Sequence, residues 1–191
     1  MQLEEFLNFI NNSKFLNQVE LSKIPNINLY MDQALTFMNE NLYQRNPHDK
    51  TLTKSMINNY VKNNLIPKPE NKKYFPQHII ALIYIFYMKQ ILSLDDVKSI
   101  CSSYTDKHFN FNDMSNLYEV FLAIEKEDEK NLEDEIKSLA SNLYSNISCE
   151  QFDDNEKLFL LISLLSSRAN IYKTMIEKLL DYNSQNNNSI K

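Results

Sequence analysis

The sequence of 191 residues contains no glycine and no tryptophan, and only two cysteines. Without glycine it has neither of the glycine-rich loops that cradle phosphate groups in P-loop proteins and in dinucleotide-binding domains. Turns that need a positive φ angle must use asparagine or aspartate, the next most tolerant residues. Two cysteines as far apart as Cys101 and Cys149 do not suggest a disulfide framework, which favours a reducing compartment.

Long hydrophobic runs are also missing. The longest, 79–88 and 158–165, are well short of the roughly 20 residues needed to cross a bilayer. The first residues are acidic and amphipathic and do not resemble a signal peptide. With 43% hydrophobic residues, the composition is that of a folded globular protein. We therefore expect a cytoplasmic protein without membrane contact.

Positive charge is scarce except in one segment. The net charge of the chain is −5, yet residues 45–74 carry a net +5, which leaves −10 for the remainder. Because salt limits the reach of exposed charges to about 10 Å, the local balance is the better guide to binding. This basic segment makes nucleic acid a candidate partner of an otherwise acidic protein.

The spacing of apolar residues predicts helices throughout, and therefore an all-α fold. The predicted helices cover residues 2–10, 29–43, 54–63, 76–90 and 93–103, then 112–146 as one helix or two, and 154–182. Residues 104–111 are predicted to form a loop, and the polar tail after residue 182 to be disordered. The predicted local signals are N-caps at Thr53 and Ser93, a left-handed helix end at Asn63 or Asn64, and a first helical turn at Pro76.

The basic segment offers two sets of candidate DNA contacts. On helix 54–63 the apolar residues Met56, Ile57, Tyr60 and Val61 share one face, and the polar residues share the other. Such a polar face suits the major groove, where asparagine pairs with adenine and lysine reaches guanine or phosphate. Lysines of the proline-rich segment 67–74 would contact the flanking phosphates. The predicted DNA-binding residues are Lys54, Ser55, Asn58, Asn59, Lys62, Lys68, Lys72 and Lys73. An ordinary solvated helix face beside a basic loop would have the same composition.

The stretch 56–100 resembles the DNA-binding domain of MerR-type transcriptional regulators. In those proteins a recognition helix ends in an aromatic residue, followed by a Gly-Leu-Leu-Pro-like turn and a wing closed by Arg-x-Tyr. Here Tyr60 takes the aromatic position, Asn64–Pro67 the turn and Lys72–Tyr74 the wing closure. The resemblance implies a winged helix-turn-helix that reads DNA with helix 54–63 and contacts phosphates with wing 67–74. Asn58 and Lys72 stand where the family usually has arginine, whose bidentate contacts lysine cannot reproduce.

More closely, residues 21–42 and 52–74 look like an uncharacterised domain family of Gram-positive bacteria, whose members are often labelled MerR-like. We therefore predict a winged helix-turn-helix domain over residues 20–110, a C-terminal helical dimerisation or effector region over 111–184, and a tail over 185–191. Helix 154–182 has a 3.5-residue apolar repeat, which favours a homodimer, although packing within one chain would use the same pattern. The repeat consists of Leu158, Ile162, Leu165, Ala169, Tyr172, Ile176 and Leu179.

Neither a catalytic constellation nor a metal site is predicted. His48, His78 and His108 lie near no nucleophile motif, and Cys101, His108 and Cys149 lack the spacing of a zinc site. We expect no enzyme activity and no cofactor, and we leave open whether a small-molecule effector exists. The alternative function is a helical protein–protein interaction module that has kept the winged-helix fold but lost DNA affinity. The acidic C-terminal half and the missing arginines favour that alternative.

Overall fold

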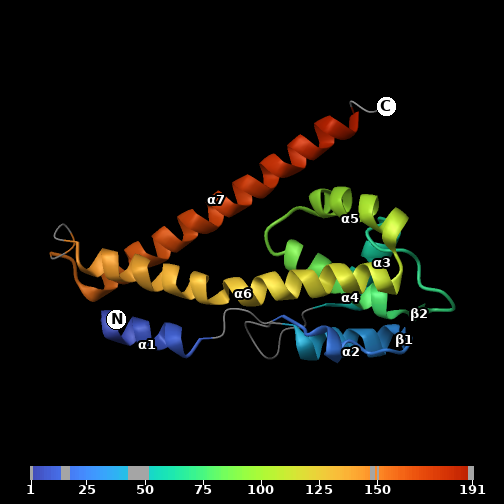
Figure 1. Cartoon of the computed structure of the whole chain (residues 1–191), viewed down its shortest axis with the longest axis horizontal. Coiled ribbons are helices and arrows are strands. Elements are labelled where there is room, and N and C mark those ends of the chain that lie inside the picture. The colour runs from blue at the N-terminus through green and yellow to red at the C-terminus, as the bar shows by residue number, and fades with distance from the viewer. Residues whose placement is uncertain (1, 14–17, 43–51, 147–148, 150, 189–191) are drawn as a thin grey trace. The chain divides into compact units, whose positions relative to one another are not determined.

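The computed structural model describes residues 2–13, 18–42, 52–146, 149 and 151–188. Within these ranges the chain forms seven α-helices and two strands of two residues each, which confirms the predicted all-α class (Figure 1). The chain divides into two compact units. The first unit is Asn17–Ile124, and the second unit combines Met1–Leu16 with Glu125–Lys191.

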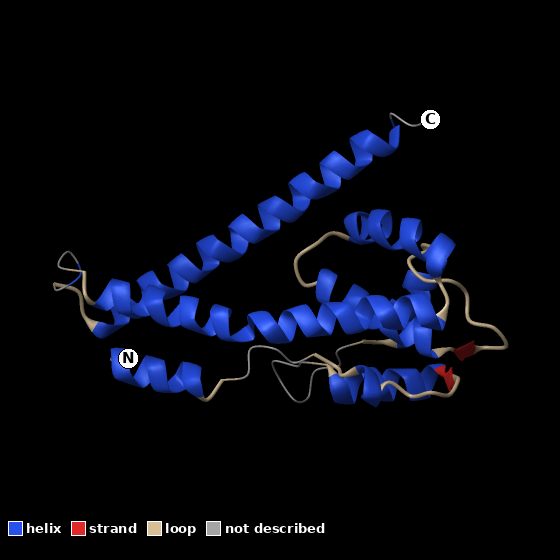
Figure 2. Cartoon of the chain, in the orientation of Figure 1, coloured by secondary structure: helices blue, strands red, loops and turns tan. Residues whose placement is uncertain are grey.

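The first unit contains the predicted DNA-binding segment. Its elements are η1 (Leu21–Lys23), β1 (Leu29–Tyr30), α2 (Met31–Asn41), α3 (Lys54–Lys62), β2 (Lys73–Tyr74), α4 (Pro76–Met88), α5 (Leu94–His108) and the start of α6 (Phe111–Tyr144). The two strands pair antiparallel, with Leu29 opposite Tyr74 and Tyr30 opposite Lys73 (Figure 2). This pairing joins the residues before α2 to the residues before α4.

Helix α4 supplies much of the first unit's core. Pro76 occupies its first position, as predicted, where the missing N–H has no intrahelical partner to lose. Eight of its 13 residues are buried, including the consecutive run from His78 to Ile83. A helix that is apolar on more than one side must be covered on more than one side. Helix α4 is therefore the frame on which the neighbouring elements pack.

Two boundaries differ from the prediction because of pairings that sequence spacing does not reveal. The segment 104–111, predicted as a loop, is helical up to His108, and α6 begins at Phe111. The ring of Tyr104 stacks on His108 with 5.2 Å between centroids, and its hydroxyl donates to the carbonyl of Asp113 at 3.3 Å. These contacts support the added turn. The predicted helix 29–43 begins instead with strand β1, because residues 29–30 pair with β2.

Other helix ends fall within a few residues of expectation. Helix α4 ends at Met88, two residues before the predicted end, and α6 is one continuous helix over the stretch predicted as one or two. Ser93 caps α5 as predicted. Its hydroxyl oxygen accepts from the Asp96 N–H at 3.1 Å, while the Asp96 carboxylate accepts from the Ser93 N–H at 3.2 Å.

The second unit consists of α1 (Leu3–Asn11), the later part of α6 and α7 (Asp154–Asn188). Helix α1 lies beside α6 (Figure 1). The core of this unit contains the buried side chains of Phe6, Ile10, Ala140, Leu143, Cys149 and Leu161. Helix α7 runs to Asn188, so it enters the tail that composition predicted to be disordered. None of the described helices combines the length and apolar character that crossing a bilayer requires.

Candidate nucleic-acid interface

Helix α3 begins at a side-chain cap and packs onto the core through two buried residues. The hydroxyl of Thr53 accepts from the Met56 N–H at 3.2 Å, which confirms the predicted N-cap. Ile57 is fully buried and Tyr60 is 4% exposed, so these two side chains turn α3 onto the core. Met56 was predicted to face the core as well, but 37% of its surface is exposed. The buried face is narrower than the sequence suggests because Met56 lies at its edge.

The entrance to α3 is held by an asparagine of α2. The side-chain amide of Asn39 donates to the carbonyl of Leu52 at 3.1 Å, and its oxygen accepts from the Leu52 N–H at 3.0 Å. Leu52 immediately precedes the cap Thr53, and its side chain is 1% exposed. Asn39 thus satisfies both backbone groups of a buried residue that forms no helical bonds. This pairing fixes where α3 begins relative to α2.

The exit from α3 uses an asparagine where a glycine is usual. Asn64 has a φ of 58°, which confirms one of the two predicted left-handed positions. The Leu65 N–H donates to the Tyr60 carbonyl at 2.9 Å, and the Asn64 N–H donates to the Val61 carbonyl at 3.1 Å. These two bonds form a Schellman motif. The chain then returns to the core, because Leu65 and the residue after it are buried.

A hairpin follows over residues 67–74. The Lys73 N–H donates to the Glu70 carbonyl at 2.8 Å, and these two residues form an isolated antiparallel bridge. The two residues between them, Asn71 and Lys72, have φ angles of 48° and 62°. Positive φ at both central positions is the signature of a type I′ turn, whose twist matches paired strands. The chain therefore builds a tight hairpin without glycine, and Lys72 stands at its tip.

Most of the predicted DNA-contacting side chains reach solvent. Seven of the eight are exposed, and Lys73 is half-buried. In the described part of the chain, no ion pair joins any of these lysines to a carboxylate. The side chain of Asn59 is engaged, because its oxygen accepts from the Asn63 amide at 2.8 Å, whereas Asn58 has no hydrogen bond to another described side chain. Arg45 and Lys50, which contribute to the basic segment, lie outside the described residues.

The base of the hairpin is closed by an aromatic cluster around His78. The imidazole packs against Tyr74, Phe75 and Phe109, with ring centroids 5.7, 5.8 and 4.7 Å away. Its Nδ1 accepts from the Phe75 N–H at 3.1 Å. Burial lowers the pKa of His78 to about 4, although the carbonyl of Pro67 pulls the pKa the other way. His78 is therefore a neutral core residue at neutral pH.

Among the described residues, no group of three or more histidine, cysteine or acidic side chains is placed to hold a metal ion. His108 is engaged with Asp113, whose carboxylate lies 2.9 Å from the imidazole Nδ1 and accepts from Asn110 at 3.0 Å. These two hydrogen bonds hold the pKa of Asp113 below its usual range. Cys149 belongs to the core of the second unit.

Sequence reasoning missed the residues that position the lysines. Asn39 was unnoticed because a single asparagine in an amphipathic helix carries no signal of its partner 13 residues away. Tyr30 was also missed. Its ring lies under the Lys73 ammonium, with 5.3 Å between the nitrogen and the ring centroid. The sequence carried no signal of this contact, because Tyr30 lies 43 positions before Lys73 and outside the basic segment 45–74.

Comparison with known families gives a match over part of the chain. Residues 19–121 match the family described as a domain of unknown function (DUF1836). This span contains η1 through the first part of α6, and so includes α3 and the hairpin. Comparison with curated proteins and with solved structures gives no match.

Proposed function

We propose that this chain, which belongs to the family described as a domain of unknown function (DUF1836), binds double-stranded DNA through α3 and the hairpin 67–74. The proposed arrangement is that of a winged helix-turn-helix regulator of MerR type. The observation that carries it is a set of exposed lysines on two adjacent structured elements, unpaired with any described carboxylate. The proposed role is binding and not catalysis.

Helix α3 is the proposed reading element. Lys54, Asn58 and Lys62 follow one another at intervals of four residues, so they share one face, and all three are exposed. Asn58 is the proposed base-reading residue, because an asparagine amide pairs bidentately with adenine in the major groove. The two lysines would contact guanine or phosphate on either side of it. Because lysine is a flexible point charge, we propose that they contribute more to affinity than to specificity.

The hairpin is the proposed wing. Lys68 and Lys72 are exposed, and Lys73 lies beside them on β2. The β1–β2 pairing anchors the hairpin to the body of the first unit. An anchored hairpin loses little conformational freedom on binding, which favours a phosphate-contacting role over that of a mobile basic loop.

Helix α7 is the proposed site of pairing with a second copy of the chain. Its first turns pack within the second unit through Leu161, which is 1% exposed. Its later part leaves five large apolar side chains more than half exposed. They are Ile171, Tyr172, Met175, Leu179 and Tyr182, called the α7 stripe below. The 3.5-residue apolar repeat that continues into this part is the pattern of two-stranded coiled coils. A two-fold dimer would present two reading helices to a two-fold symmetric DNA site.

Binding is tested by fluorescence anisotropy with an AT-rich duplex at low and higher salt. Each phosphate contact changes affinity roughly threefold between about 50 and about 200 mM salt. We expect Lys54→Ala, Lys62→Ala and Lys72→Ala to weaken binding, each lowering the salt slope by about 0.9. Lys126→Ala is the matched control, because Lys126 is an exposed lysine in the acidic part of α6. Affinity unchanged in all three variants, or lowered equally by the control, contradicts this placement.

The rival function is a protein-interaction module without DNA affinity. The exposed α7 stripe and the net −10 outside residues 45–74 favour it. The anisotropy experiment separates the two functions, because an interaction module retains no salt-dependent affinity for any duplex. Asn58→Ala adds a test of sequence reading. We expect it to reduce discrimination between the preferred and a scrambled site by about 1–3 kcal/mol.

Pairing through α7 is tested by sedimentation equilibrium. We expect Met175→Lys and Leu179→Lys to shift the protein from dimer to monomer, because a charge in an apolar seam is unfavourable. Asn170→Lys is the control, since Asn170 is exposed and lies on the side of α7 opposite the stripe. A wild-type protein that sediments as a monomer at all concentrations rules out the pairing.

A further inference from the structure

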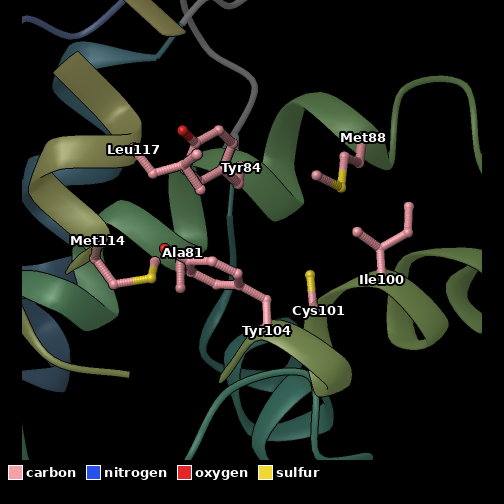
Figure 3. Close-up of a pocket in the computed structure, with 8 residues that line it drawn as sticks. All are labelled: Ala81, Tyr84, Met88, Ile100, Cys101, Tyr104, Met114 and Leu117. Carbon is pink, nitrogen blue, oxygen red and sulfur yellow. The ribbon is translucent and has the colours of Figure 1, made fainter. Parts of the chain in front are cut away.

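The first unit contains an apolar cavity of about 160 Å³ between three of its helices. Three residues of α4, three of α5 and two of α6 line it, and Figure 3 shows all eight. The side chains of Ile100 and Cys101 extend from α5 toward α4, where Met88 lies (Figure 3). The cavity is partly open to solvent. Protein interiors are packed as densely as organic crystals, so an apolar space of this volume that the neighbouring side chains leave unfilled is uncommon. Contacts outside the cavity must therefore hold its walls apart.

Its aromatic walls are held from outside the cavity. The ring of Tyr84 packs edge-on against Tyr118 and Phe121, with centroids 5.5 and 5.6 Å away. Tyr118 is itself fixed, because its buried hydroxyl donates to the Val19 carbonyl at 2.6 Å. These contacts stop Tyr84 from turning inward to fill the space.

The opposite wall is anchored in the same way. Tyr104 bonds to the backbone of Asp113 and stacks on His108. Both partners lie away from the cavity lining. Because Tyr84 and Tyr104 are held by contacts behind them, turning either ring into the cavity would break a hydrogen bond or an aromatic pair.

The lining selects an uncharged, apolar ligand. Carbon and sulfur atoms make up nearly all of the cavity surface, and no side chain that lines it carries a charge at neutral pH. Burial raises the pKa of the Cys101 thiol to about 11, so this sulfur is present as a thiol and acts as a small apolar group. Leu117 lines the cavity and is 44% exposed, which gives a ligand a route from solvent.

We propose that this cavity is a binding site for a small apolar molecule, of the size of a benzene ring or a short branched hydrocarbon group. An apolar cavity of about 150 Å³ engineered into another protein stays dry and binds benzene or xenon. The site belongs to the same compact unit as α3 and the hairpin, but its occupation does not depend on DNA binding. The sequence leaves open whether a small-molecule effector exists, and this cavity would be the site that binds it.

The test uses the whole chain of 191 residues, labelled at the methionine methyl groups and titrated with benzene in NMR spectra. Met88 and Met114 line the cavity, whereas Met38, Met56 and Met175 lie elsewhere and serve as internal controls. We expect saturable shifts of the first two methyl signals and none of the other three. We also expect the unfolding midpoint to rise with benzene concentration, because the ligand binds only the folded chain.

Filling the cavity should abolish the effect. Ala81→Leu places three further carbons in the space, and Cys101→Leu is a second filling variant in case the first does not fold. We expect affinity for benzene to fall at least tenfold in each. Ser99→Leu, on the exposed side of α5, should bind benzene like the wild type. The proposal is overturned if the wild-type Met88 and Met114 signals do not move, if all methionine signals move alike, or if a folded filled variant binds as well as the wild type.

Discussion

The ammonium nitrogen of Lys73 lies 5.3 Å from the centre of the Tyr30 ring. The two residues are direct partners across the β1–β2 pairing, 43 positions apart in the sequence. The Tyr30 ring is 53% exposed, so the lysine rests on a surface ring while its charge remains accessible to solvent. The pair therefore links the proposed wing to the start of α2 and limits the positions that this lysine samples.

Removing the ring should loosen this lysine. A cation–π contact at an exposed site contributes about 0.5–1 kcal/mol. We expect Tyr30→Ala to lower the free energy of unfolding by about that amount and to weaken DNA binding severalfold. Tyr30→Phe keeps the ring and should resemble the wild type in both. Urea unfolding measures the effect on stability, and fluorescence anisotropy with a duplex measures the effect on binding. Equal DNA affinity in all three proteins would show that this contact does not contribute to DNA binding.

Lys72 should show opposite effects on stability and on binding. Its φ of 62° is unfavourable for a residue with a Cβ atom, at a cost of about 1–2 kcal/mol relative to the right-handed conformation. We expect Lys72→Gly to raise the free energy of unfolding by up to about 1 kcal/mol while weakening DNA binding. Asn71→Gly is the control that relaxes the same turn and keeps the charge. A Lys72→Gly variant that binds DNA as tightly as the wild type would contradict a phosphate contact there.

The Asn39–Leu52 pairing should be important for stability. Asn39→Leu leaves the N–H and the carbonyl of Leu52 without their partners, and each unsatisfied buried group costs about 1–3 kcal/mol. Asn39→Asp keeps the acceptor for the N–H but loses the donor, so its loss in stability should be smaller. Urea unfolding ranks the variants, and amide hydrogen exchange at Leu52 shows whether the opening is local. The prediction is wrong if the two substitutions destabilise equally.

Acid should destabilise the protein through His78. Its pKa is about 4 in the folded chain and near 6.5 when unfolded, so the unfolded chain binds the proton more readily. Protonation of His78 therefore leaves the free energy of unfolding unchanged above pH 6.5. As the pH falls from 6.5 toward 4, it lowers the free energy of unfolding by roughly 3 kcal/mol in all. His78→Gln keeps an acceptor for the Phe75 N–H and should flatten the slope in that window. Thermal unfolding of the two proteins is compared from pH 4.5 to 7.5 in steps of about half a unit. Identical slopes of stability against pH would show that His78 does not cause the acid destabilisation.

The local features of this chain follow from short-range rules. Thr53 and Ser93 cap their helices and Pro76 begins α4, because each acts on backbone groups within a few residues. Because the chain has no glycine, an asparagine was predicted at the left-handed position that ends α3, and Asn64 occupies that position. The all-α class was likewise readable, since the apolar spacing repeats with the helical period.

Only the tertiary structure decided how the candidate interface is assembled. Lys73 over Tyr30 and Asn39 on Leu52 join residues from different elements. Met56 was assigned to the core by its helical phase but is exposed, because the width of a buried face depends on what packs against it. The cavity beside Cys101 depends on aromatic residues anchored from behind, which no spacing rule records. By itself, the sequence determined the helices, their caps and the basic segment, because these depend on neighbours along the chain, whereas the contacts that orient the lysines and keep the cavity open depend on neighbours in space.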